Sequence, residues 1–250
     1  MWNKPDALNA LADLLLLAGV AALLAVGVVW LVRVPSLPIK QVVFTQELHQ
    51  VRRLEVEQAL PTALKGNFFS VNLDAVRAAL EKLPWIRRVQ VRRVWPARLE
   101  VSVEEHRAAA RWESGAAASN ELVNTYGEVF AAPLARTEAA LLPALHGPAG
   151  TAPDLLRRHG DWTESFRALG QRPIQVLLSP RLSWHMRLDS GMAIELGRDQ
   201  PKSPVGARLE RFVKVYGETV GQRETLPAVV DLRYPNGFAL RGAAVAGKGK

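Results

Sequence analysis

Residues 14 to 32, LLLLAGVAALLAVGVVWLV, form an apolar run of 19 residues with no charged or strongly polar side chain. This length is close to the ~20 residues that a helix needs to cross the hydrocarbon core of a bilayer. A cleaved secretory signal, the main alternative, normally has an apolar region of ~7 to 15 residues behind a clearly basic start, whereas Lys4 is the only base ahead of this run. A buried core helix is disfavoured because nothing polar interrupts any face. The run predicts an uncleaved transmembrane anchor.

The charges beside this run leave open which side of the membrane the rest of the chain occupies. Lys4 precedes the run, while Arg33, Lys40, Arg52 and Arg53 follow it, and a simple count of positive charge favours a cytoplasmic carboxyl portion. Long domains, however, are translocated largely regardless of their charge, and about 218 residues follow the run. The charge count therefore does not decide the orientation.

Composition narrows the classes of function. With 250 residues, 48% of them hydrophobic and 22% charged, the chain can build one or two globular cores. A formal charge of +8 permits nucleic acid, an anionic membrane surface or an acidic protein as the partner. The chain has no cysteine, which excludes disulfides, zinc ribbons, thiol nucleophiles and iron–sulfur clusters.

The first soluble segment reads as strand, helix, helix, strand, strand. Residues 39–44, IKQVVF, are rich in β-branched side chains and predict a strand. Helices are predicted over 51–60, with Val51 and Leu54 on the apolar face, and over 73–83, where apolar residues recur at spacings of three and four. The two strands that follow are predicted from a different pattern, in which apolar and charged residues alternate with a period of two.

Residues 84 to 107, PWIRRVQVRRVWPARLEVSVEEHR, contain two arginine pairs within seven residues. Apolar and charged residues alternate on both sides of Trp95-Pro96, which predicts a β-hairpin with one face on the helices and one in water. Unlike charges can pair across such strands. The arginines therefore indicate a solvated sheet face. A nucleic-acid site is the less favoured alternative, because interleaved glutamates repel phosphate and no aromatic residues are spaced for base stacking.

From Glu121 onward the pattern becomes mostly strands, with apolar pairs flanking Tyr126-Gly127 as in a hairpin. The Pro-, Gly- and Ala-rich residues 143–153 predict a loop. We further expect a helix from Pro153 with the stripe Leu155, His159, Trp162, Phe166 and Leu169; strands over 174–178, 182–188 and 192–196; and a helix from about Pro204 with Val205, Leu209, Phe212, Val213 and Tyr216 on one face.

The chain closes with PAVVDLRYPNGFALRG, residues 227 to 242. We predict a strand, a turn over 234–237 and a short strand over 238–241. A strand that arrives last in a sheet often lies at its edge, with unpaired N–H and C=O groups along one side. Such an edge is either protected or used for binding.

Catalytic and metal-binding patterns are absent from the sequence. The five histidines have no metal-ligand spacing, and the common nucleotide-binding, nucleophile-elbow and zinc-protease motifs do not occur. Glu104 and Glu105 are adjacent in a predicted strand, so their carboxylates face opposite sides. We therefore expect no catalytic residue, no metal and no cofactor. A cell-wall hydrolase stays open only if carboxylates from distant segments converge.

Two stretches resemble the FtsQ/DivIB family of bacterial cell-division proteins. Residues 66–112 resemble its polypeptide-transport-associated (POTRA) domain in the order of Gly-Asn-Phe-Phe, Leu-Pro-Trp, Arg-x-Trp-Pro and Val-x-Val-Glu. The ending Val-Asp-Leu-Arg-Tyr-x-x-Gly and the upstream Arg-x-x-Arg-Phe, here residues 208–212, are similar to the family's carboxyl-terminal β domain. The sequence departs from the pattern at Thr45-Gln46, where the family usually has a glycine, and at Ala108, where a proline is common.

The resemblance implies an α+β fold with a transmembrane helix, a POTRA-like β-α-α-β-β domain and a mainly antiparallel β-sheet domain with helices. The implied boundaries are a short cytoplasmic segment 1–13, a transmembrane helix 14–34, a POTRA-like domain 37–107, a β domain 108–243 and a flexible tail 244–250. It further implies a non-enzymatic scaffold at the division septum, single-pass in the inner membrane, with its large carboxyl-terminal part in the periplasm.

The partners that the resemblance implies are FtsB and FtsL, and the binding mode we expect is strand addition at the last strand. The predicted contact residues are Arg233, Tyr234, Asn236, Gly237 and Phe238, because tyrosine and arginine suit binding hot spots and glycine leaves room for a close backbone. Arg181 is added because the family tends to keep a basic residue there, where it would meet an acidic partner. The plain alternatives are a simple turn at 234–237 and a surface charge at 181.

Overall fold

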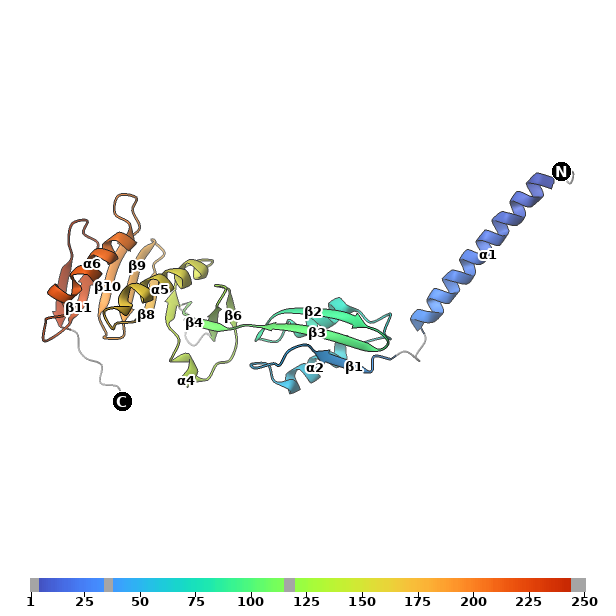
Figure 1. Ribbon diagram of the computed structural model, residues 1–250, viewed down its shortest axis with the longest axis horizontal. Helices are drawn as coiled ribbons and strands as arrows, with labels where there is room; N and C mark the ends of the chain where they lie inside the picture. The colour runs from blue at the N-terminus through green and yellow to red at the C-terminus, as the bar shows by residue number, and fades with distance from the viewer. Residues whose placement is uncertain (1–4, 34–37, 115–119, 244–250) are drawn as a thin grey trace. The chain divides into compact units, whose positions relative to one another are not determined.

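The computed structural model describes residues 5–33, 38–114 and 120–243 (Figure 1). They fall into two compact units, Met1–Glu105 and His106–Lys250. The predicted tail 244–250 lies outside the described residues. Helix α1, Pro5–Arg33, contains the apolar run, and its segment Asn9–Trp30 is long and apolar enough to cross a membrane. The helix starts nine residues before the run, because proline is well tolerated in the first turn and the residues after it are mostly good helix formers.

The first unit continues with the five predicted elements in the predicted order. They are β1 (Gln41–Phe44), α2 (Arg53–Ala63), α3 (Leu73–Leu80), β2 (Ile86–Val94) and β3 (Arg98–Glu105). The sheet order is β1-β3-β2, with β1 parallel and β2 antiparallel to β3. The buried apolar residues come from α2, α3, β2, β3 and the segments next to them: Val51, Val56, Leu60, Ala63, Phe68, Val71, Val76, Leu80, Trp85, Ile86, Val89, Leu99, Val101 and Val103.

Helix α2 differs from the prediction in its phase and its length. Leu54 is 60% exposed, whereas Val56, Leu60 and Ala63 are buried. The spacing of four and three between these buried residues defines the apolar face, and Leu54 lies off it. The α3 prediction was also too long, because the helix ends at Leu80, shortly before Pro84, a residue that disfavours helical backbone just before it.

The charged face of the β2–β3 hairpin is present, with one exception. Arg92 forms two hydrogen bonds to Glu100, at 3.0 and 2.8 Å, and Arg87 binds Glu104 at 2.8 Å. Arg93 instead donates to the carbonyls of Phe68 and Val71, at 2.9 and 2.6 Å. Period two places this arginine on the face of Val89 and Val91, so the prediction of a uniformly solvated arginine face was wrong at this position.

The second unit is one nine-stranded sheet in the order β12-β11-β10-β9-β8-β7-β4-β5-β6 (Figure 1). Five of its eight strand pairings are antiparallel, as expected of a mainly antiparallel sheet. Its elements are β4 (Ala108–Trp112), β5 (Glu121–Asn124), β6 (Val129–Ala131), α4 (Arg136–Ala139), β7 (Ala144–His146), α5 (Ala152–Arg167), β8 (Pro173–Leu178), β9 (Ser183–Leu188), β10 (Ala193–Arg198), α6 (Val205–Thr219), β11 (Pro227–Asp231) and β12 (Ala239–Ala243).

The predicted helical stripes form the core of this unit. Leu155, Trp162 and Phe166 of α5 and Leu209 and Phe212 of α6 are buried in one cluster with the sheet residues. The rings of Trp162 and Trp184 meet edge to face at 5.5 Å between centroids. Both helices therefore pack on the sheet, and the binding surface has to be sought along its edges, its loops or its other face.

Several boundaries in the second unit differ by one or two residues from the predicted ones, and two differences have a clear physical cause. The predicted loop 143–153 contains strand β7, which pairs in parallel with β4 and β8. Three residues between Pro143 and Gly147 carry no local strand signal, so partners distant in sequence determine this strand. Strand β9 begins at Ser183 because Leu182 has a φ of 60°, a left-handed conformation that belongs to the preceding turn.

Candidate functional site

Strand β12 lies at one end of the nine-stranded sheet, as the sequence predicts. It pairs antiparallel with β11, and no other strand of the described residues pairs with its outer side. An edge strand of this kind presents a row of backbone donors and acceptors to which a further strand can bind.

The hydrogen-bond pattern shows which backbone groups face outward. The N–H of Leu232 donates to the carbonyl of Glu195 in β10 at 2.8 Å, so the even-numbered residues of β11 face β10 and the odd-numbered ones face β12. In the β11–β12 register, Asp231 lies opposite Ala239. Ala239 and Arg241 of β12 therefore bond to β11, and the N–H and C=O groups of Leu240 face away from the sheet.

The side chains of the edge divide between the core and the surface. Phe238 is half-buried and meets Phe212 of α6 edge to face, with 5.3 Å between ring centroids. Leu240 also packs against the core. Phe238, one of the predicted contact residues, thus also anchors the strand, and a charged substitution there would disturb folding together with binding.

The other predicted residues of the closing turn are exposed. Tyr234 is 53% exposed, and Asn236 and Gly237 are exposed beside it. A Cβ atom added at Gly237 would meet no atom within 4 Å, so the protein's own packing does not require a glycine there. The turn therefore offers an accessible aromatic ring and an unobstructed stretch of backbone.

Arg233 is held in place by a buried carboxylate. Its guanidinium binds Asp231 at 2.6 and 2.8 Å and Glu195 at 3.0 Å, and Arg241 binds the same Asp231 at 2.8 Å. The hydrogen bond from Arg233 is the main cause that lowers the pKa of Asp231, against the opposing effect of burial. Asp231 in turn raises the pKa of Arg233. The carboxylate therefore fixes two cations beside the edge strand.

A glycine allows Arg233 to lie across the neighbouring strand. Gly197 has a φ of 72° and follows a register shift in the pairing of β10 with β9. A Cβ atom at this position would come within 2.9 Å of Cγ of Arg233. The backbone conformation and the close approach both require glycine here.

Arg181 lies in the turn between β8 and β9 and is exposed. The structure brings it to the same open pocket as Arg233, at the end of the sheet where β10 and β11 finish. The pocket is lined by Ser179, Arg181, Ser183, Gly197, Arg198, Gln200, Arg208 and Arg233. Four arginines and no carboxylate line it. Its chemistry suits acidic side chains.

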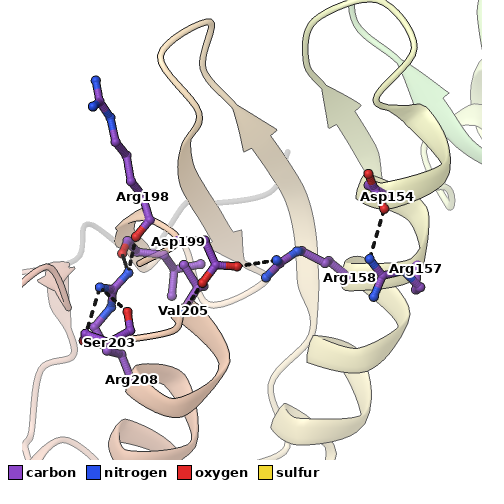
Figure 2. Close-up of polar contacts among 9 residues, drawn as sticks. Asp154, Arg157, Arg158, Arg198, Asp199, Ser203, Val205 and Arg208 are labelled. Atoms are coloured by element: carbon purple, nitrogen blue, oxygen red, sulfur yellow. Dashed lines mark hydrogen bonds and ion pairs between the residues drawn. The ribbon is translucent and has the colours of Figure 1, made fainter. Parts of the chain in front are cut away.

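Arg208 is the buried member of the four arginines that line this pocket (Figure 2). Arg208 of α6 donates to the carbonyls of Leu196, Arg198 and Ser203, at 2.6, 2.8 and 2.9 Å. Burial lowers the pKa of Arg208 from its ordinary value. Its role is structural, since its donors are directed at backbone carbonyls in β10 and in the segment that follows it.

Asp199, the first residue after β10, is bonded to both α5 and α6 (Figure 2). It accepts from the N–H of Val205 at the start of α6, at 3.0 Å, and binds Arg158 of α5 at 2.5 Å. Partial burial acts to raise the pKa of Asp199, but the bonds from Val205 and Arg158 outweigh it and the pKa is lowered.

Sequence analysis missed three residues of this region: Asp231, Arg241 and Arg198. Asp231 belonged only to a terminal motif and Arg241 only to a predicted strand, while Arg198 lay beyond the predicted strand 192–196. Their alternation could have shown that Asp231 and Arg241 share a face, but the pairing register that joins them is a property of the folded sheet. In the part of the chain that the structure describes, no group of three or more His, Cys, Asp or Glu residues could hold a metal ion.

The fold defines an α+β protein with an apolar amino-terminal helix, a POTRA unit and a β domain. Residues 37–106 match the family described as "POTRA domain, FtsQ-type", and residues 110–233 match "Cell division protein FtsQ/DivIB, C-terminal". The chain belongs to the FtsQ/DivIB family of cell-division proteins, and a role in cell division follows from this membership. Strand β12 lies beyond the second match.

Relatives named cell division protein FtsQ match nearly the whole chain. The protein of Nitrosospira multiformis is 38% identical over 97% of this chain and 99% of its own length. That of Burkholderia pseudomallei is 34% identical over 98% and 96%, and that of Coxiella burnetii 32% over 96% and 94%. These matches extend to both soluble units and agree with the resemblance derived from the motifs.

Proposed function

We propose that this chain is a non-enzymatic scaffold of the division complex that binds FtsB, and with it FtsL, through the edge of its β domain. A segment of FtsB adds to β12 as a further strand, and main-chain hydrogen bonds supply much of the affinity. The single observation that carries the proposal is the outer side of β12: no strand of the described residues pairs with it, and Leu240 directs its backbone N–H and C=O toward it.

Selectivity in this proposal comes from charge. Arg233 and Arg241 flank the edge, and Arg181 and Arg198 extend the positive surface along the end of the sheet. An added strand that carries acidic residues gains ion pairs there, while a basic strand is repelled. Tyr234 and the Asn236-Gly237 turn lie at the start of the edge, where they contact the same segment.

The proposed setting is a membrane. Helix α1 anchors the chain once in the inner membrane, and the residues from 37 onward lie in the periplasm at the division septum, as a POTRA-like domain 37–107 and a β domain 108–243. The short segment 1–13 before the transmembrane helix 14–34 stays in the cytoplasm.

Substitution of Leu240 tests strand addition. Leu240→Pro removes the outward N–H of the edge, whereas Leu240→Ala removes the side chain and keeps the N–H. We expect Leu240→Pro to bind FtsB about tenfold more weakly than Leu240→Ala. A tenfold change in affinity corresponds to about 1.4 kcal/mol, which is the order of magnitude expected for one lost hydrogen bond together with the strain that proline introduces. Equal affinity of the two variants, measured by titration calorimetry with both proteins folded, would contradict the proposal.

A further inference from the structure

An exposed aromatic cluster lies in the first unit where Trp95, in the turn between β2 and β3, meets Phe68 and Phe69, in the loop between α2 and α3. Trp95 is 68% exposed and Phe69 38% exposed, and their ring centroids lie 6.4 Å apart. Phe68 supports both from below, at 6.0 Å from Trp95 and 5.2 Å from Phe69. The inner ring completes the core, whereas the two outer rings present apolar area that the unit itself does not cover.

This turn lies at the end of the unit where the chain arrives from α1. The N–H of Lys40 donates to the carbonyl of Ala97 at 2.8 Å, and β1 starts opposite Arg98 in a parallel pairing. Only seven residue steps join Arg33, the last residue of α1, to Lys40, and a fully extended chain covers at most about 25 Å in that number. The covalent chain therefore keeps the turn close to the end of the apolar helix.

The same end of the unit is basic. Lys40, Lys65 and Arg98 are exposed, and within the described ranges none of them forms an ion pair. The nearby Glu100 is already paired with Arg92, at 2.8 Å. The opposite end of the unit carries charges of both signs, with Glu81, Glu104 and Glu105 beside Lys82, Arg87 and Arg88.

We propose that this aromatic tip, formed by Phe69, Trp95, Lys40, Lys65 and Arg98, binds the surface of an anionic lipid bilayer, the one that α1 crosses. Indole rings favour the boundary between headgroups and acyl chains, and lysine and arginine are drawn to anionic headgroups within about 8 Å of the surface at physiological salt. The inference rests on the proposed membrane anchor. As a consequence of this binding, the first unit contacts the membrane through the aromatic tip, and its opposite end faces away from the membrane.

The absence of cysteine from the sequence makes the test direct, because each introduced cysteine is the only one to label. Three full-length variants, Ala97→Cys, Lys82→Cys and Leu24→Cys, carry a nitroxide at the tip, at the opposite end of the unit and in α1. They are reconstituted in liposomes of phosphatidylcholine and phosphatidylglycerol. Collisions of the nitroxide with oxygen, which partitions into lipid, and with a water-soluble nickel chelate measure its depth.

We expect the label at position 97 to be severalfold less accessible to the nickel chelate than the label at 82, and to lose this protection in phosphatidylcholine alone. Equal accessibility at 97 and 82, with the label at 24 embedded, would overturn the tip proposal and point to a protein as the occupant of the rings. A label at 24 that is open to the nickel chelate would instead contradict the proposed anchor.

A second set of variants in the Ala97→Cys background identifies the groups responsible. Trp95→Ser with Phe69→Ser, or Lys65→Glu with Arg98→Glu, should return the label to water. Leu54→Ser removes an equally exposed apolar side chain outside the tip and should leave its depth unchanged. Circular dichroism before and after heating confirms that each variant is folded. Protection that survives both double substitutions would contradict the assigned residues.

Discussion

At the scale of single residues, Asp231 organises the candidate site although it is itself buried. Its two oxygens receive Arg233 and Arg241, and these side chains stay about half exposed. A carboxylate in this position is stabilised by the cations more than it is destabilised by burial, which is why its pKa is lowered.

Substitution of this carboxylate should therefore weaken the fold. We expect Asp231→Asn to lower the free energy of unfolding by about 2 kcal/mol, because an amide keeps the shape but turns an N–H₂ group toward a guanidinium. Asp154→Asn, which loses only an exposed ion pair with Arg157 (Figure 2), should change it by less than about 0.5 kcal/mol. Urea titration in detergent measures both, and equal effects would show that Asp231 is dispensable.

The lowered pKa also fixes the sign of a pH effect. A group whose native pKa lies below its unfolded value near 4 stabilises the protein above that pH, and the contribution is lost as the pH falls through the native pKa. The wild-type chain should thus lose stability below about pH 4 more steeply than Asp231→Asn does.

The alternation of charged and apolar residues predicted most of the residue positions but not all. It identified the face of Glu100 and Arg92 correctly, because these residues lie opposite each other in the part of the β2–β3 pairing that keeps a period of two. It failed at Arg93, which lies on the apolar face and donates hydrogen bonds to carbonyls in the loop between α2 and α3. Leu54 was misplaced for a related reason: helix phase depends on where the helix starts, and Val51 lies before α2 begins.

At the scale of elements, local pattern predicted the helices and the hairpins, and tertiary contacts decided the rest. The stripes of α5 and α6 contain enough apolar residues to define a face by themselves. Strand β7 has three residues and exists because β4 and β8 provide its hydrogen bonds. The edge position of β12 could be expected from its place at the end of the chain, but the direction of its free groups required the register.

The bulge in β10 is the element on which the position of Arg233 depends. Gly197→Ala puts a side chain at a φ of 72° and against Cγ of Arg233, and should cost about 1 to 2 kcal/mol of folding stability and weaken FtsB binding. Gly206→Ala, a helical site in α6 with no atom within 4 Å of the added Cβ, should be neutral or slightly stabilising. Unfolding and binding measured side by side distinguish them, and full FtsB affinity in Gly197→Ala would mean that Arg233 need not lie across β10.

At the scale of the whole molecule, the sequence predicted the parts well because each has its own physical signal. An apolar helix is recognised by length and hydropathy alone, and the POTRA unit by motifs at fixed positions within one compact segment. The arginine pocket has no such signal, since its residues come from the β8–β9 turn, from β10, from α6 and from the segment after β11. Only the folded sheet brings Arg181 and Arg233 to one place.

The proposed orientation in the membrane is a property of the whole chain, and flanking charge does not decide it. If the residues after α1 lie outside the cytoplasm, protease added to intact spheroplasts should remove them, because α1 is the only described segment long and apolar enough to cross the bilayer. A cytoplasmic marker protein should stay intact in the same sample and be digested only after detergent. Protection of residues 38–243 until detergent is added would place the edge of the β domain in the cytoplasm, where no periplasmic segment of a partner could add to it.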